Sequence, residues 1–130
     1  MSVVNAFEAI RAEILTDDDI KSLVGENILF GATPLNQQPK NFITLNYSEL
    51  NGGSFCRQYE LKFTIVTTSY LKTAQIKEKA IELLDRFNDD YGLKNDLGSV
   101  QSIQLVNGNE IIFNPDDKKF YTFLYFRVIL

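Results

Sequence analysis

The last ten residues, YTFLYFRVIL (residues 121–130), constrain the fold of this 130-residue chain more than any other stretch. Four of the ten are aromatic and one, Arg127, is charged, so the strand that they predict is apolar on both faces. Such a strand requires cover on both sides, and one small core buries one side of it. The end of the chain therefore predicts a function that depends on a partner.

Alternation along a strand assigns these side chains to two opposite faces. Leu124, Phe126 and Val128 are expected to face the helices of the domain. The other side is expected to carry Tyr121, Phe123, Tyr125 and Ile129. An aromatic sheet face without cover in the monomer is a candidate interface. The alternative is that the first helix or the long loops fold over this face and close it within the chain.

The composition is that of one soluble globular domain, because 45% of the residues are hydrophobic and 23% are charged. No apolar run approaches the roughly 20 residues of a transmembrane helix, and the first residues lack a signal-peptide pattern. We therefore expect a protein that is cytosolic at synthesis and has no membrane partner. The net charge of −4 and the pI near 4.8 argue against a broad nucleic-acid-binding surface.

The chain has no histidine and one cysteine, Cys56. An intrachain disulfide, a Cys/His zinc site and a nucleophile paired with histidine are therefore excluded. The run Asp17–Asp19 is expected to lie at a helix N-terminus, where carboxylates are favoured. Asp89, Asp90 and Asp96 lack the spacing of a calcium loop. We predict no catalytic site, no metal site and no cofactor.

Three helices are predicted from apolar periodicity and end signals. Val3, Phe7, Ile10 and Ile14 share one face of a first helix that ends near Leu15, with Ser2 as its N-cap.

The second helix is expected to begin with Thr16 as its cap and Asp19 at the third helical position, and to end at Gly25. The third is predicted over residues 71–87, with Glu82 and Arg86 as an exposed ion pair.

Six strands are predicted, at residues 27–30, 42–47, 56–67, 100–106, 110–113 and 119–130. Hairpin turns are expected at Asn51-Gly52-Gly53, Asn107-Gly108 and Asn114-Pro115-Asp116-Asp117, and a polar loop at 88–99. The predicted fold is α+β, a single domain with an antiparallel-rich mixed sheet and two main helices packed on one face. Its best-buried residues are expected to be Phe63, Ile65, Leu83, Leu84, Phe87, Leu124 and Phe126.

Three segments, in this order, resemble the small phage tail-completion proteins, also called tail terminators. They are ILTDDDIKSLVGENILFGATP (residues 14–34), the long strand and amphipathic helix of residues 59–87, and the closing FYTFLYFRVIL. The likeness covers nearly the whole chain. Each motif is weakly specific, so the resemblance rests on the order of the motifs. The chain departs from the family in an Asn/Gln-rich loop at 35–38 and in lacking a proline directly before Phe42.

The resemblance implies a structural virion protein at the head–tail junction, assembled in the host cytoplasm. Such proteins form a ring, generally of six subunits, on the last ring of the tail tube. The implied partners are further copies of the chain, the tail tube protein and the head connector or head-closure protein, with DNA passing through as cargo. The ring stops tube polymerisation and joins the tail to the head.

The expected oligomer or tube interface comprises Tyr121, Phe123, Tyr125, Arg127, Asn36, Gln37 and Gln38. Two other classes of function stay open at this stage. One is a monomeric or dimeric binding module that holds a peptide or small ligand on the same sheet face. The other is an enzyme that relies on carboxylate or lysine chemistry. A related possibility within the structural hypothesis is a head connector or head-closure subunit. Such a subunit is expected to have a different strand order.

Overall fold

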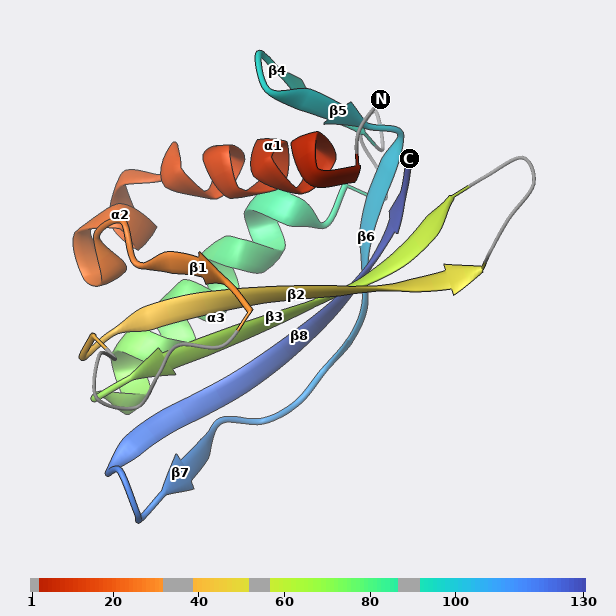
Figure 1. Ribbon diagram of the computed structural model, residues 1–130. Helices are drawn as coiled ribbons and strands as arrows, with labels where there is room; N and C mark the ends of the chain where they lie inside the picture. Colours follow the sequence, from red (N-terminus) through yellow and green to blue (C-terminus); the bar gives the residue numbers. More distant parts are fainter. Residues whose placement is uncertain (1–2, 32–38, 52–56, 87–91) are drawn as a thin grey trace.

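The computed structural model describes residues 3–31, 39–51, 57–86 and 92–130 (Figure 1). The elements are α1 (Val3–Leu15), α2 (Asp18–Val24), β1 (Ile28–Phe30), β2 (Phe42–Asn51), β3 (Gln58–Thr67), α3 (Tyr70–Leu84), β4 (Leu93–Asn95), β5 (Gly98–Val100), β6 (Ser102–Gly108), β7 (Ile112–Asn114) and β8 (Lys119–Ile129). Helices on a mostly antiparallel sheet make the fold α+β, which confirms the predicted class.

The main sheet has the strand order β1-β2-β3-β8-β6, and β7 also pairs with β8. β1 runs parallel to β2, and the other pairs of this sheet are antiparallel. β8, the last strand in the chain, therefore lies inside the sheet. Its 11 residues span about 36 Å at 3.3 Å per residue, so one edge has room for both β6 and β7.

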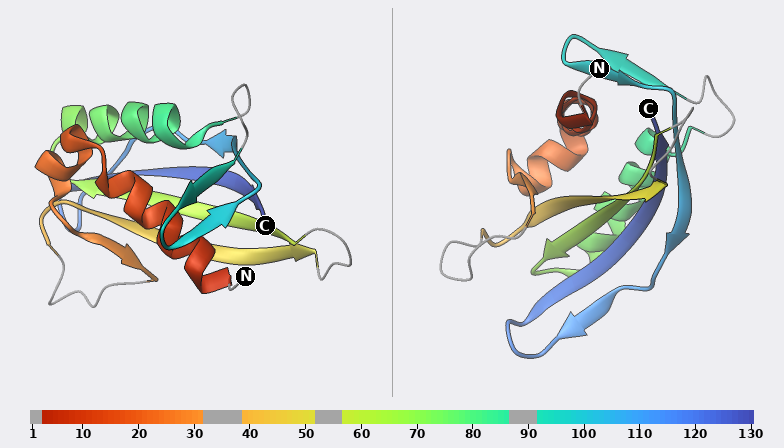
Figure 2. Two further views of the ribbon diagram at one scale, coloured as in Figure 1. Left: turned by 90° about the horizontal axis from the view of Figure 1, so that it is seen from above. Right: turned by 45° about the vertical axis from the view of Figure 1, so that its right-hand side comes forward.

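The core lies between the sheet and the layer formed by α1 and α3 (Figure 2). Phe63 of β3 and Phe126 of β8 meet edge to face there, with ring centroids 6.1 Å apart, and both are fully buried. Ile65, Leu84, Leu124 and these two phenylalanines confirm the predicted core. Leu83 is half-buried at its margin, and the predicted core residue Phe87 lies outside the described residues.

The predicted cap of the second helix is wrong. Asp17 is the N-cap of α2, because its carboxylate accepts a hydrogen bond of 3.0 Å from the backbone N–H of Ile20. The Thr16 hydroxyl instead donates to the carbonyl of Glu13, at the end of α1. Gly25 ends α2 as predicted, with φ of +62°. Ser2, the predicted cap of α1, lies outside the described residues.

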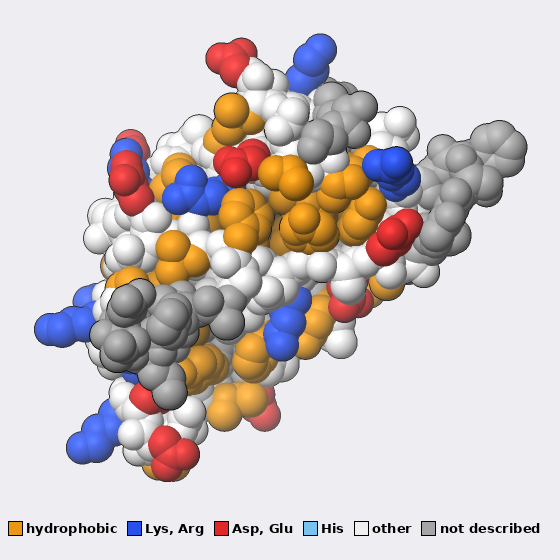
Figure 3. Space-filling model, in the orientation of Figure 1, with side chains coloured by type: hydrophobic (Ala, Val, Ile, Leu, Met, Phe, Trp, Pro, Cys, Tyr) orange, Lys and Arg blue, Asp and Glu red, His pale blue; other side chains and the backbone are white. Residues whose placement is uncertain are grey.

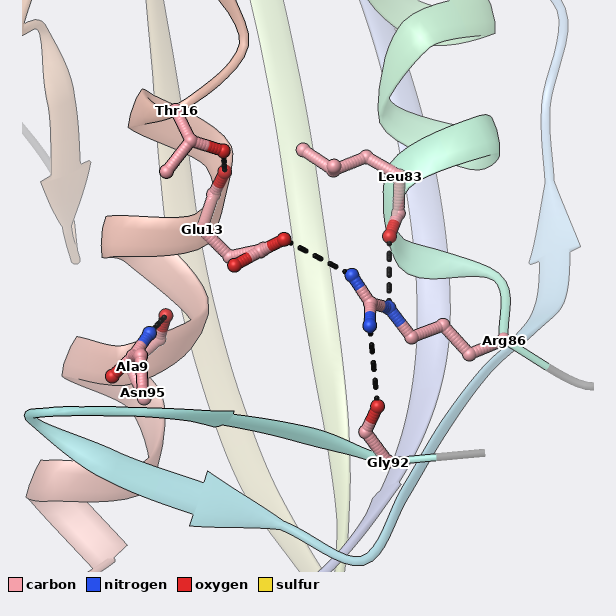
Figure 4. Close-up of polar contacts among 7 residues, drawn as sticks. All are labelled: Ala9, Glu13, Thr16, Leu83, Arg86, Gly92 and Asn95. Atoms are coloured by element: carbon pink, nitrogen blue, oxygen red, sulfur yellow. Dashed lines mark hydrogen bonds and ion pairs between the residues drawn. The ribbon is translucent and has the colours of Figure 1, made fainter. Parts of the chain in front are cut away.

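The predicted ion pair between Glu82 and Arg86 is wrong as well. α3 ends at Leu84, so Arg86 lies beyond the helix and is not one turn from Glu82. Arg86 Nη2 donates to the carboxylate of Glu13 on α1 at 3.0 Å, and its Nε and Nη1 donate to the carbonyls of Leu83 and Gly92 (Figure 4). Arg86 therefore ties α1 to the end of α3 and to the start of the next segment.

The segment predicted as a polar loop, 88–99, contains β4 and the start of β5, which form an antiparallel hairpin against α1. Asn95 Nδ2 donates to the carbonyl of Ala9 at 2.9 Å (Figure 4). A Cβ at Gly98 would lie 2.7 Å from the carbonyl oxygen of Asn5, so glycine permits this close approach. Contact with α1, rather than a periodic pattern, stabilises these three-residue strands.

The predicted turn at Asn107-Gly108 is also wrong, because both residues belong to β6 and pair with β8. β6 and β7 do not form a hairpin with one another; each pairs with β8. Asn109 bridges them: its backbone N–H donates to the Phe123 carbonyl at 3.1 Å, and its Oδ1 accepts from the Phe123 N–H at 2.7 Å.

The other two predicted turns lie between strands that pair as expected. β7 and β8 pair antiparallel across the Asn114–Asp117 turn, which confirms it, and Lys118 adopts a left-handed φ of +60° there. β2 and β3 also pair antiparallel. Gly52 and Gly53 between them lie outside the described residues.

Candidate interface on the open face of the sheet

β8 presents two different surfaces. Thr122, Leu124, Phe126 and Val128 are buried on the side of the helices. On the opposite side Tyr121, Phe123 and Tyr125 are half-buried, and Arg127 is exposed. We call that side of the sheet the open face. α1 and α3 lie on the other side (Figures 1 and 2), so α1 does not close the open face.

The open face brings the four predicted β8 residues into one row. Asn36, Gln37 and Gln38 lie outside the described residues, so their place in an interface stays a prediction. Residues 32–38 are also the part of the chain that the loop alternative requires. The arrangement of the helices excludes the alternative in which the first helix covers the aromatic face. The alternative in which long loops cover it is not excluded.

Neighbouring strands extend the row into a surface. On β3, the half-buried Lys62 lies opposite Tyr125, and Thr64, which lies opposite Phe123, is buried. Lys62 Nζ stands 4.6 Å from the centroid of the Phe123 ring, which is a cation–π geometry. The Phe123 ring is therefore partly covered by the Lys62 ammonium group.

An apolar corner forms where β7 joins β8. Phe42 and Val66 pair across β2 and β3, Val66 pairs with Tyr121, and Tyr121 pairs with Ile112. A shallow depression at this corner is lined by Ile112, Phe113, Asn114, Pro115, Tyr121 and Phe123. Phe42 and Val66 are buried, so the exposed part of this corner is Ile112 and Phe113. Alternation along a strand did not predict their place there, because it assigns a residue to a face but does not show which strands are adjacent.

Tyr121 has its hydroxyl engaged within the chain. It donates a hydrogen bond to the carboxylate of Asp117 in the β7–β8 turn. Burial, and then this bond, raise the pKa of Tyr121 to about 12. The hydrogen bond to Asp117 holds the ring against the sheet.

Cations outnumber carboxylates on the open face, although the chain as a whole is acidic. The face carries Lys62, Lys119 and Arg127 against Glu60 and Asp117. Lys119 Nζ donates to the Pro39 carbonyl at 3.0 Å. Arg127 lies opposite Glu60 in the register, yet no described carboxylate is within 4.0 Å of its guanidinium. Its charge is thus available to a carboxylate of a partner.

Two of the acidic residues singled out in the sequence, Asp17 and Asp19, have partners within the chain. Asp17 caps α2, and Asp19 lies 3.4 Å from Lys79 of α3. Within the described ranges, no group of three or more Cys, Asp or Glu side chains is placed to hold a metal ion. Asp89 and Asp90 lie outside those ranges.

The helices in the described part of the chain are too short or too polar to cross a membrane.

No protein-family model matches the chain, and no curated protein matches it in sequence. Five chains of known structure are similar to it. One of them is a chain from the virion of a native gene transfer agent (GTA) particle, with a TM-score of 0.75 and 12% sequence identity. The match covers 98% of this chain and 96% of that chain. The two proteins therefore share a fold over nearly their whole lengths.

Proposed function

We propose that this protein is a structural component of a phage or phage-like virion. The observation that carries the proposal is the shared fold with a GTA virion chain, at a TM-score of 0.75 and across 98% of this chain. The match covers almost all of both chains, so the likeness belongs to the whole domain and not to one common motif. The virion is its place of action, and no enzymatic activity is assigned.

Within that class, the role proposed is that of a tail terminator. The protein forms a ring of six subunits at the head-proximal end of the tail tube, stops tube polymerisation and joins the tail to the head. The resemblance of the sequence to tail-completion proteins supports this role. DNA passes through the ring as cargo, and an acidic chain suits that passage because DNA is an anion.

The open face is the proposed contact surface of this assembly. Tyr121, Phe123 and Tyr125 are half-buried and lie in one row beside the exposed Arg127. Tyrosine suits an interface, since it buries a large ring and keeps a polar end at the rim. A charge such as Arg127 sets register and partner choice more than affinity.

The experiment that tests the proposal introduces a charge on the open face. Tyr125→Glu is expected to stay folded, fail to cap tubes and give overlong tails in electron micrographs. Leu71→Glu is the matched control, because Leu71 is 70% exposed on α3, on the opposite side of the sheet. It should fold and terminate tails at normal length. A folded Tyr125→Glu protein that still terminates tails would refute the role of this face.

A second candidate is a module that holds a peptide or small ligand on the sheet. The depression at the β7–β8 corner, lined in part by Ile112 and Tyr121, is the observation that favours it. Native mass spectrometry of the wild type discriminates the two. A ring with or without tube protein supports the terminator, and a monomer that retains a ligand and never joins a tube supports the module.

A further inference from the structure

A second apolar surface lies away from the open face, in a cleft between α1 and the β1–β2 edge of the sheet. The cleft is lined by Val4, Phe7, Glu8, Phe30 and Tyr47. Val4 is 56% exposed, Phe30 is 40% exposed and Tyr47 is 41% exposed. Figure 3 shows hydrophobic side chains gathered over this region between the helix and the strands.

Ring contacts and one hydrogen bond connect the walls of the cleft. Phe7 stacks on Tyr47 with ring centroids 4.1 Å apart and planes 7° apart, and meets Tyr59 edge to face. Arg11 Nε donates to the Ile28 carbonyl at 2.6 Å, which ties α1 to β1. A preformed apolar cleft loses little conformational entropy when a partner fills it.

The charge of the cleft is opposite to that of the open face. Glu8 is the one charged residue in its lining, and Arg11 is turned to the backbone of β1. Glu49, also exposed, lies two residues beyond Tyr47 on the same side of β2. The open face, by contrast, has an excess of cations and an exposed Arg127 without a described carboxylate near it.

We propose that this cleft receives the open face of a second copy of this chain, with Arg127 of one subunit paired to Glu8 of the next. The cleft lies at the β1 edge on the helix side, and the open face lies on the other side of the sheet. When one patch of a subunit binds a different patch of the next subunit, the contact is heterologous. Such contacts form a closed ring if the rotation between subunits allows it. The inference rests on the proposed function and names both halves of its ring contact.

Charge alone does not select this occupant, so the apolar parts must also match. Tyr125 and Phe123 precede Arg127 on the same face of β8, and both are half-buried aromatic residues that can pack on the exposed parts of Phe30 and Tyr47. Aromatic pairs of this kind add to the burial of apolar area. A second copy thus supplies both the rings and the cation that the cleft lacks.

Cysteine cross-linking tests the contact. The variant Glu8→Cys/Arg127→Cys, made in a Cys56→Ser chain, is oxidised at the highest soluble concentration. We expect a ladder of disulfide-linked multimers on a denaturing gel, since each copy has two unlike ends. Each single variant, Glu8→Cys or Arg127→Cys, should stay monomeric. Covalent dimers from Glu8→Cys alone would indicate a symmetric contact and overturn the inference.

A charge exchange gives an independent measurement. Glu8→Arg and Arg127→Glu alone should each weaken self-association at least tenfold in sedimentation experiments, and together they should restore it. Glu78→Arg, exposed on α3, is the control and should change little. Failure of the double variant to restore association would overturn the pairing.

Failure of the proposed contact can be distinguished from failure of the proposed function. Absence of the ladder overturns the inference in every case. If wild-type rings are present in native mass spectra or micrographs, the proposed function stands and another surface makes the contact. If wild-type rings are absent both alone and with tube protein, the terminator role fails as well.

Discussion

The two faces of β8 both carry aromatic side chains and differ in what covers them. Phe126 is fully buried against the ring of Phe63, beneath the helix layer. Phe123, three residues earlier and on the opposite face, is half-buried and has the Lys62 ammonium over its ring. The same residue type in one strand thus has a protein neighbour on one side and a solvated cation on the other.

This difference separates stability from assembly. The closed face is satisfied within the chain, so substitutions there are expected to lower the free energy of unfolding. The open face contributes less to folding and is available for contacts between subunits. Substitutions on the two sides of the sheet should therefore differ in their effect on folding.

The strongest test compares Phe126→Ala with Phe123→Ala. Removing Phe126 leaves a cavity beneath the helices and should lower the free energy of unfolding by about 3–5 kcal/mol. Removing the half-buried Phe123 ring should cost less than half of that, because solvent or the Lys62 stem fills the space. Chemical denaturation monitored by circular dichroism measures both. Equal losses would show that the open face is as essential to the fold as the closed one.

Gly98→Ala tests how tightly the β4–β5 hairpin is held against α1. A Cβ there would meet the Asn5 carbonyl oxygen at 2.7 Å, so the backbones must separate. We expect a loss of about 1–3 kcal/mol, the usual result of overpacking. Gly108→Ala is the comparison and should cost less, since its nearest contact is a side-chain methyl of Leu124 at 3.0 Å and not a backbone atom. A Gly98→Ala protein as stable as the wild type would show that the hairpin moves freely.

Arg86→Met tests the link between α1 and α3. The methionine keeps much of the apolar stem but removes the donors to Glu13, Leu83 and Gly92. The side chains of Arg86 and Glu13 are about a quarter exposed, at 27% and 25%, so we expect a loss of about 1–2 kcal/mol. Glu13→Gln, which retains an acceptor, should cost less. If Arg86→Met leaves stability unchanged, the network does not stabilise the closed side.

Much of the fold was predictable because its strands and helices carry strong periodic patterns. The alternation of Tyr59, Leu61, Phe63 and Ile65 assigned β3 correctly, and all four are buried. The alternation of residues 121–128 likewise separated the faces of β8. In each of these stretches, local sequence and tertiary burial favour the same structure.

The errors arose where tertiary contacts decide the structure. β4 and β5 have three residues each, too few for a periodic signal, and form because α1 lies against them. Asn107-Gly108 has the composition of a turn, but β8 is long enough to pair with this segment and with β7 in succession. The second half of the proposed contact, the cleft at Phe30 and Tyr47, depends on two elements distant in sequence and had no signal of its own.

The smallest expected effect concerns pH and Tyr121, at the edge of the open face. The pKa of Tyr121 is about 12 in the folded chain, above its ordinary value of 10.0, chiefly because of burial. The folded state therefore holds this proton more tightly than the unfolded state. Its contribution to stability is complete below about pH 10 and is lost as the pH rises towards 12.

Tyr121→Phe removes this contribution, so stability should fall less between about pH 9.5 and about pH 11.5 in the variant than in the wild type. The other tyrosines and the lysines titrate in both proteins, and the difference between the two curves isolates Tyr121. Asp117→Asn should lower the pKa of Tyr121 without returning it to 10, because burial is the larger cause and remains. Identical pH curves for wild type and Tyr121→Phe would show that this corner of the face is fully solvated. Tyr121 would then belong with Arg127 as an exposed residue of the open face and not with the half-buried residues Phe123 and Tyr125.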